Sequence, residues 1–369
     1  MNRRSFLGAA LAGPMMAGAF AGPGAMAQTS TSAPATRALP PDHPLQDSWK
    51  AWKALCLSPE GRVIDGFQDN ASHSEGQGYG LSLATAFGDE EATARIIRWT
   101  EANLAVRDDR LLAWRWLPDT TPHIADRNNA SDGDIFYAWG LIQASAFAER
   151  EARLERAGTI VQDLLRRCVV SAPDGSGALV LLPGVSGFRR PEGVVVNPSY
   201  HMGRAMRDLA VACEAPEMAR LADDGDALIA AIAARGPVPD WVMLTERGIV
   251  AAPQPFSGVS GYEAVRVPLF ALWSDQAENP ALKAFATAMA AAGTNGGTPT
   301  VFDPEGRGVF ERSAHAGYAA VAALADCVTT GEVGSLIPGF TSDQPYYPAT
   351  LHLMALVIQA STFPRCVPI

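Results

Sequence analysis

Residues 134–149, DIFYAWGLIQASAFAE, are followed after a single residue by EARLERAGTIVQDLLRRC at 151–168, and this stretch decides the fold. In both segments the apolar residues have the spacing of an α-helix. A connection this short makes the two helices neighbours that pack against each other. Many helices of the chain come in such pairs, and paired helices favour a closed ring.

Helical spacing also dominates the rest of the chain. One apolar stripe starts at Trp49, and a second follows Asp89, a residue suited to cap a helix. No repeat of fixed period is present, so a ring or bundle is favoured over a solenoid. An exception lies at 178–196, where two apolar stretches flank a loop rich in Gly and Arg and predict a short β-hairpin. Further helices are predicted at residues 76–87, 199–213, 217–235, 262–274, 279–292, 312–326 and 346–361, which makes about eleven in all.

The composition is that of one large folded domain. Its 369 residues are 48% hydrophobic and 18% charged, which is enough to bury a single core. The net charge is −10 and no stripe of Lys and Arg is present, so no nucleic-acid partner is expected, because phosphate binding needs clustered cations. The five cysteines lie far apart, which leaves both disulfides and free thiols open.

The N-terminus has the pattern of an export signal. Arg3 and Arg4 precede the small and apolar run 8–20, and Ala25-Met26-Ala27 fits a signal peptidase. We expect a signal peptide at 1–27, of twin-arginine type or read by the general secretion route, and therefore a periplasmic or secreted protein. Residues 28–42, rich in Ser, Thr, Ala and Pro, predict a flexible leader before a folded domain at 43–369. No later apolar run is long enough to span a membrane.

Several common kinds of site lack their residues here. The glycines at 76–80 have neither the spacing nor the preceding strand of a dinucleotide site, and no phosphate-binding loop occurs. The sequence at 258–262 has Tyr262 where a serine hydrolase elbow needs Gly. The six histidines never fall at metal-ligand spacings. We therefore expect no cofactor and no metal.

Carboxylates in unusual company are the remaining candidates for chemistry. Glu75, in SHSEGQGYGL at 72–81, lies where a loop becomes a helix, and its small neighbours would let a bulky polymer approach. A helix N-terminal Glu stabilised by the macrodipole explains the same position. Asp126, Asp132 and Asp134 lie in a polar stretch just before a buried helix, where they could bind sugar hydroxyls or merely cap that helix.

A further acid and a set of aromatic residues complete the candidates. Glu263 lies at another loop-to-helix junction, with Arg266 three residues later on the same face. A cation beside a carboxylate keeps it ionised, as a general base requires, although an ordinary intrahelical ion pair has the same spacing. Flat aromatic faces suit pyranose rings, with core packing as the ordinary alternative. The aromatic candidates are Trp114, Trp116, Tyr200, Tyr262, Trp273 and the pair Tyr346-Tyr347.

Together these segments resemble glycoside hydrolase family 8, in particular the bacterial endoglucanases that accompany cellulose synthase. The resemblance rests on SEGQGYG at 74–80, ASDGD at 130–134, NPSY at 197–200 and YEAVR at 262–266. It implies an all-α fold, an (α/α)6 barrel with a short β-hairpin excursion, and hydrolysis of a β-1,4-glucan with inversion. Glu75 would then be the general acid, and Asp132 would bind the distorted sugar and orient the water.

One position departs from the family pattern, because the residue aligned with Glu263 is usually Asp. Glu263 is the candidate general base, and Asp132, Asp134 and Asp126 are the alternatives. The implied function is an endo-β-1,4-glucanase acting on cellulose. It would be accessory to cellulose biosynthesis, with the synthase complex as a candidate partner. A hydrolase of xylan or chitosan, and a glucan-binding accessory protein without turnover, are the alternative functions. The remaining residues implied to bind substrate are Trp114, Trp116, Asp134, Tyr200, Tyr262 and Arg266.

Overall fold

A computed structural model describes residues 38–303 and 308–368. The predicted signal peptide at 1–27 and the predicted leader as far as residue 37 lie outside the described residues. At the end of that leader, the Leu39 amide donates a hydrogen bond of 2.8 Å to the Ala86 carbonyl, and the Leu39 side chain packs against the core. The packed part of the chain therefore already includes Leu39.

Eleven α-helices occupy the described residues, and each one overlaps a helix predicted from the sequence. Three of them begin four residues later than predicted, at Gly203, Arg266 and Ala316. A 3₁₀ turn, η1 (Pro198–Tyr200), precedes the first, a hydrogen-bonded turn precedes the second, and a strand that ends at Ser313 precedes the third. The helices are α1 (Leu45–Cys56), α2 (Ser74–Ala86), α3 (Glu90–Asn103), α4 (Ser131–Ala144), α5 (Arg150–Cys168), α6 (Gly203–Ala212), α7 (Pro216–Ala233), α8 (Arg266–Trp273), α9 (Pro280–Ala292), α10 (Ala316–Thr330) and α11 (Tyr346–Ser361).

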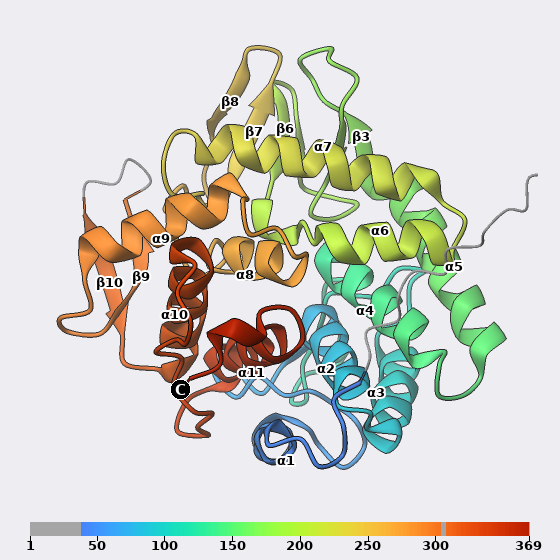
Figure 1. The fold of residues 1–369 in the computed structure, drawn as a ribbon. Helices are drawn as coiled ribbons and strands as arrows, with labels where there is room; N and C mark the ends of the chain where they lie inside the picture. The colour runs from blue at the N-terminus through green and yellow to red at the C-terminus, as the bar shows by residue number, and fades with distance from the viewer. Residues whose placement is uncertain (1–37, 304–307, 369) are drawn as a thin grey trace, which may run out of the picture. The chain divides into compact units, whose positions relative to one another are not determined.

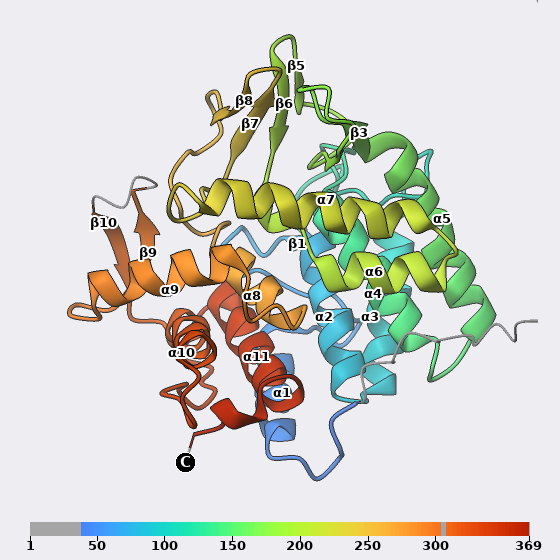
Figure 2. The ribbon, with the colours of Figure 1, turned by 45° about the horizontal axis from the view of Figure 1, so that its top comes forward.

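The helices form two layers, as the pairing in the sequence predicts. Consecutive helices pack as the pairs α2/α3, α4/α5, α6/α7, α8/α9 and α10/α11, and α1 packs on α11. Around the inner layer, α2 contacts α4, α4 contacts α6, α6 contacts α8, α8 contacts α11, and α11 returns to α2 (Figure 1, Figure 2). The ring is therefore closed, and the expected (α/α)6 barrel is confirmed.

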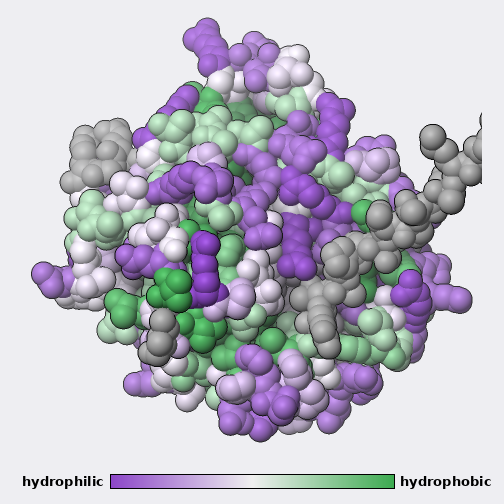
Figure 3. Space-filling model, viewed as in Figure 1, coloured by the Kyte–Doolittle hydropathy of each residue, from purple (hydrophilic) through white to green (hydrophobic). Residues whose placement is uncertain are grey.

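Sequence character separates the two layers. The inner helices α2, α4, α8 and α11 are apolar or small on every side and are buried along almost their whole length. The outer helix α5 instead buries one stripe, which includes Ile160 and Leu164, and turns charged residues outward. Some apolar residues of the described chain are exposed, including Val333 and Leu336 in the loop after α10. In the space-filling view, hydrophobic side chains gather over α10 and α11 (Figure 3).

Glycines let the two central helices α2 and α4 approach closely. A Cβ on Gly78 of α2 would lie 2.7 Å from the Phe136 Cβ and 2.9 Å from the Tyr137 amide nitrogen of α4. A Cβ on Gly133 of α4 would lie 2.3 Å from the Ser74 Oγ of α2. All three distances are shorter than the contacts that real Cβ atoms make, so the two backbones can meet only because these glycines have no side chain.

The described strands are short and lie outside the helical ring. The predicted hairpin at 178–196 is present only in part, because a smaller hairpin of β5 and β6 lies within it, whereas the two predicted strands pair with other partners. β4 pairs with β3, which follows α5 directly, and β6 pairs with β7, where Val194 and Leu244 share a second apolar cluster. The hairpins β7–β8 and β9–β10 were not predicted. The strands are β1 (Ser72–His73) with β2 (Arg115–Trp116), β3 (Val169–Ser171) with β4 (Leu179–Leu181), the sheet of β5 (Arg189–Arg190), β6 (Gly193–Val196), β7 (Val242–Thr245) and β8 (Gly248–Ala251), and β9 (Thr298–Phe302) with β10 (Val309–Ser313).

The cysteines divide between one disulfide and three free thiols. Cys327 near the end of α10 is bonded to Cys366 in the 3₁₀ turn η2 (Pro364–Cys366), which ties the C-terminal segment to the ring. Cys56 and Cys168 are buried thiols, and Cys213 is half-buried. All described helices fall short of the length and apolarity that a membrane crossing needs.

The close approach of α2 and α4 can be tested with Gly78→Ala. The added methyl group meets backbone and Cβ atoms that cannot rotate away, so we expect the free energy of unfolding to fall by about 1–3 kcal/mol. Gly158→Ala in α5 is the matched control, because nothing lies within 4 Å of its Cβ position. That change should raise stability by up to about 1 kcal/mol, since alanine favours a helix over glycine. Urea denaturation measures both, and equal effects would contradict the close packing.

Candidate active site

A cavity of about 430 Å³ opens at the N-terminal ends of the inner helices. Glu75 lies in the first turn of α2, Asp132 in the first turn of α4, Arg266 at the start of α8, and Tyr346 at the start of α11. The positive ends of helix dipoles favour carboxylates, so this convergence is a suitable place for several acids. The cavity is lined by Asp65, Phe67, Gln68, His73, Ser74, Glu75, Trp114, Ala130, Asp132, Tyr200, Tyr262, Glu263, Arg266, Tyr318, Pro345, Tyr346, Tyr347 and Pro348.

The Arg266 guanidinium links three carboxyl groups of this cavity. Its Nη1 is ion-paired with Glu75, its Nη2 is ion-paired with Glu263, and Nη1 lies 3.5 Å from the Asp132 Oδ2. Arg266 is only 2% exposed. A charge so deeply buried needs compensating partners, and these three acids come from three different elements of the fold.

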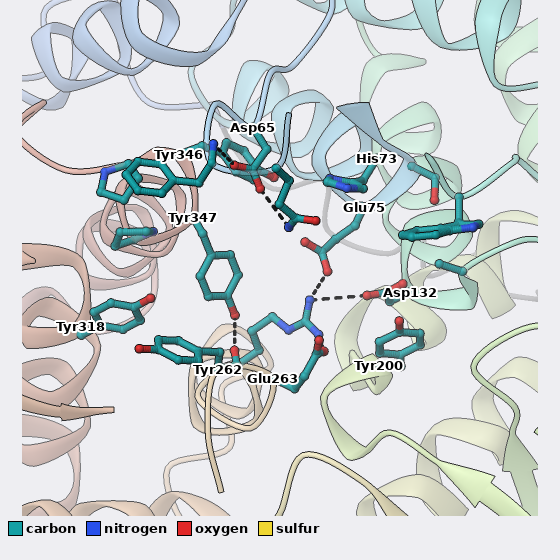
Figure 4. Close-up of a pocket in the computed structure, with 18 residues that line it drawn as sticks. Asp65, His73, Glu75, Asp132, Tyr200, Tyr262, Glu263, Tyr318, Tyr346 and Tyr347 are labelled. Carbon is teal, nitrogen blue, oxygen red and sulfur yellow. Dashed lines mark hydrogen bonds and ion pairs between the residues drawn. The ribbon is translucent and has the colours of Figure 1, made fainter. Parts of the chain in front are cut away.

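The Arg266 guanidinium also donates hydrogen bonds to neutral side chains. Its Nη1 donates to the Tyr79 hydroxyl at 3.1 Å, and its Nη2 donates to the Ser199 Oγ at 2.7 Å. Tyr79 belongs to α2 and Ser199 to η1, so the guanidinium also joins these elements. Glu75 and Glu263 lie on opposite sides of the group that links them (Figure 4). The arrangement holds the two carboxylates on opposite sides of one buried cation, and both line the cavity.

Glu263 is held from two directions. Its Oε2 accepts hydrogen bonds from the Asn197 Nδ2 at 3.1 Å and the Ser199 Oγ at 3.4 Å. The turn that carries Glu263 is fixed by Asp240, whose Oδ1 accepts from the amides of Gly261 at 2.9 Å and Ala264 at 2.8 Å. Burial raises the pKa of Asp240 to about 6. The Glu263 side chain remains 37% exposed, so water can reach it.

Asp132 is the most buried of the three acids, with a side chain 1% exposed against 22% for Glu75. Its Oδ1 accepts a hydrogen bond of 2.7 Å from the Gly133 amide. Burial, and next the negative charge of Glu75, raise the pKa of Asp132 well above its ordinary value. The cluster therefore retains a proton at a pH where isolated carboxyl groups have lost theirs.

Aromatic residues line the cavity on both sides of the acids. His73 stacks on Trp114 with ring centres 6.0 Å apart, and Tyr200 lies beside Asp132. Tyr262, Tyr318, Tyr346 and Tyr347 stand on the other side of Glu75 (Figure 4). Burial raises the pKa of Tyr200, Tyr346 and Tyr347 well above the usual value, so their hydroxyl groups are neutral donors and acceptors. Such walls offer flat apolar faces together with hydroxyl groups.

Three residues proposed from the sequence are not among those that line this cavity. Trp116 packs instead between Trp99 and His123, with ring centres 5.5 and 4.6 Å away. Asp134 points into the core, where it accepts hydrogen bonds from the Leu112 amide at 2.8 Å and the Asn129 Nδ2 at 2.9 Å. Trp116 and Asp134 therefore lie outside the lining of this cavity, Trp116 in an aromatic cluster and Asp134 in a buried hydrogen-bond network.

The third residue, Asp126, supports an aromatic wall from behind. Its Oδ2 accepts a hydrogen bond of 2.9 Å from the Trp114 Nε1, and its Oδ1 caps the local turn at the Asn128 amide. Asp126 and Asp134 are thereby removed as alternative bases. Asp132 is the alternative that still lines the cavity.

Several lining residues were not selected from the sequence. Asp65, Phe67 and Tyr318 carry no local signal, because loop residues and a helical Tyr are common everywhere. The pair Tyr346-Tyr347, in contrast, is one of the aromatic candidates from the sequence, and both residues line the cavity, whereas the candidate Trp273 is buried in the core. Among residues 38–303 and 308–368, no group of three or more His, Cys, Asp or Glu side chains is placed to hold a metal ion.

The chain matches the family model described as glycosyl hydrolases family 8 over residues 14–361. It is 30% identical over 340 residues to a probable endoglucanase of Novacetimonas hansenii, which covers 91% of this chain and 96% of that protein. An endoglucanase of Cellulomonas uda is 34% identical over 232 residues, covering 62% of this chain and only 64% of the relative.

Solved structures agree with the sequence relatives. An endo-β-1,4-glucanase from Acetobacter xylinum superimposes with a TM-score of 0.76 at 29% identity, covering 88% of this chain and 99% of that one. A family 8 endoglucanase from Klebsiella pneumoniae gives a TM-score of 0.75 at 30% identity, covering 85% and 99%. With the family model matching nearly the whole chain, and with three carboxyl groups gathered at the N-terminal ends of the inner helices, this chain belongs to glycoside hydrolase family 8.

Proposed function

We propose that the protein is an endo-β-1,4-glucanase that cuts cellulose chains internally with inversion at the anomeric carbon. The observation that carries the proposal is the pair Glu75 and Glu263 on opposite sides of the Arg266 guanidinium, in a cavity walled by aromatic residues. An inverting glycosidase needs two carboxyl groups separated widely enough to admit a water molecule. The names of the relatives, endoglucanase and endo-β-1,4-glucanase, support this choice of substrate.

Glu75 is the general acid in this proposal. It donates a proton to the glycosidic oxygen while the bond from that oxygen to the anomeric carbon breaks. Asp132, whose pKa is raised by burial, shares the Arg266 cation with Glu75 and is a second proton carrier in the same cavity. A substrate that enters beside Glu75 displaces part of its pairing with Arg266 and turns the acid toward the sugar.

Glu263 is the general base. It takes a proton from the water that attacks the anomeric carbon from the opposite face. The pairing with Arg266 and the hydrogen bonds from Asn197 and Ser199 all reach its Oε2. The same three partners hold the carboxylate in place, so the extra methylene of Glu relative to Asp does not leave it mobile.

Asp132 and the aromatic walls bind the sugars. A buried carboxyl group beside the acid is placed to hold hydroxyl groups of the sugar at the cleavage point. Tyr200 on one side and Tyr262 on the other are placed to receive the sugars that flank it, and Trp114, which stacks on His73, is a further lining residue that can receive one. The proposal also includes export, directed by the twin-arginine-like N-terminus. It further includes an accessory role in cellulose synthesis, and this part rests on the resemblance of the sequence motifs.

Removal of the acid tests the central assignment. We expect Glu75→Gln to lower kcat on soluble cellulose by about 10²- to 10⁴-fold, because the leaving sugar no longer receives a proton. The loss should be much smaller on a cello-oligosaccharide whose leaving group is dinitrophenolate, which needs no proton. Glu278→Gln, a change to a glutamate whose side chain is 89% exposed, is the control and should behave as wild type. Equal activity of Glu75→Gln and wild type on both substrates would refute the role.

The stereochemistry and the base can be tested together. Proton NMR of the first products should show the α-anomer, because a β-linkage is cut with inversion. Glu263→Gln should lower kcat by about 10²- to 10⁴-fold. Initial β-products would exclude inversion. Full activity of Glu263→Gln would refute its role and leave Asp132 as the candidate general base. Rates on cellulose, xylan and chitosan, measured side by side, would show which polymer is the preferred substrate.

The shared proton predicts how activity depends on pH. The raised pKa of Asp132 means that the cluster keeps its proton below that pKa and loses it as the pH rises through it. We therefore expect the alkaline limb of kcat/KM to lie well above about pH 4, the ordinary pKa of an aspartate. Initial rates in buffers of constant ionic strength measure it. A fall in activity that is already complete near pH 5 would contradict the shared proton.

A further inference from the structure

Two exposed aromatic side chains line the cavity of the active site. Phe67 is 80% exposed and Tyr262 is 43% exposed. The Tyr262 hydroxyl donates to the Glu311 Oε2 at 2.8 Å, and its ring lies 6.0 Å from the Tyr318 ring. Among the described aromatic residues, none has its ring stacked on Phe67. Phe67 is thus a large apolar group at the mouth of the cavity with most of its surface in water.

The loop that carries Phe67 is fixed by backbone and polar contacts alone. Its ends are joined by a bridge between Asp65 and Ala71, whose hydrogen bond from the Asp65 amide is 2.9 Å long. The Asp65 carboxylate accepts from the Phe67 amide at 2.9 Å and from the Gln68 Nε2 at 3.1 Å. The phenyl ring contributes to none of these bonds, so the fold of the loop does not account for it.

The same loop is anchored next to an aromatic wall. The Arg115 Nη2 donates to the Gln68 carbonyl at 3.4 Å and lies 3.6 Å from the Asp69 carboxylate. Arg115 follows Trp114, which lines the cavity. Phe67 is therefore held at a defined place on the rim, beside the walls that the proposed function assigns to the sugars.

We propose that Phe67 is an additional sugar-stacking platform, which binds a glucosyl ring of a long glucan chain where that chain leaves the cavity. The inference rests on the proposed function, since the occupant is the glucan itself. An exposed phenyl ring gains by covering the apolar face of a pyranose, which removes apolar surface of both partners from water. Because the backbone of this loop is already held, binding does not have to order the segment that carries the ring.

The position of Phe67 makes its effect depend on chain length. Asp132 and Arg266, which are 1% and 2% exposed, lie at the floor of the cavity, whereas Phe67, which is 80% exposed, lies at its rim. A short oligosaccharide bound at the floor does not reach the rim. A chain long enough to leave the cavity contacts Phe67 as well, so the ring selects for polymers and long oligosaccharides.

Binding in a catalytically silent background tests this platform. In Glu75→Gln protein, which does not consume the ligand, the Kd of cellohexaose and of cellobiose is measured by calorimetry with and without Phe67→Ala. We expect Phe67→Ala to raise the Kd of cellohexaose about fivefold, and Phe67→Trp to restore it. The Kd of cellobiose should stay the same. Both variants change an exposed side chain, so the fold should be retained.

Phe310→Ala is the matched control, because Phe310 is 61% exposed and does not line the cavity. It should leave the Kd of cellohexaose as it is. If Phe67→Ala leaves that Kd unchanged, or weakens cellobiose equally, the platform is refuted while the proposed function stands. If the protein with Phe67 intact binds no cello-oligosaccharide at all, it is the proposed function that fails.

Discussion

The buried guanidinium of Arg266 is the constraint around which the rest of the site is organised. A cation that is 2% exposed is tolerable only with close anionic and polar partners, and Glu75, Asp132 and Glu263 supply the charge. These acids belong to α2, α4 and the turn before α8, so one ion cluster fixes the relative positions of three inner elements. The requirement of catalysis, two separated carboxyl groups, is met by the same contacts that compensate the buried charge.

The acids can meet there because of how the helices pack. Gly78 and Gly133 let α2 and α4 approach more closely than any side chain would allow, and this brings Glu75 and Asp132 into one cavity. The N-terminal ends of the inner helices point to the same place, where their dipoles favour negative charge. The glycine-rich character of the segment around Glu75 is therefore a packing requirement first, and it opens the site to a polymer as a consequence.

Local patterns predicted some parts of the site and misplaced others. Glu75, Asp132 and Glu263 were all selected because each is an acid at a loop-to-helix junction, and such junctions converge in a closed ring of paired helices. Trp116 and Asp134 have the same residue types within two positions of true lining residues, yet one packs against Trp99 and the other hydrogen-bonds to the core. A shift of two residues along a helix, as from Asp132 to Asp134, turns the side chain to nearly the opposite face, and residue type alone does not record direction.

The sequence by itself determined the helices, their pairing and the family, because apolar periodicity and short connections are local properties and the motifs are contiguous. Only the tertiary structure decided which strands pair. The apolar residues of β4 and β6 are compatible with several partners, and in the fold β4 pairs with β3 and β6 pairs with β7. The tertiary structure also decided that Arg266 is ion-paired with Glu75 and Asp132 as well as with Glu263. Those contacts join residues up to 191 positions apart, and no local pattern carries information about such distant partners.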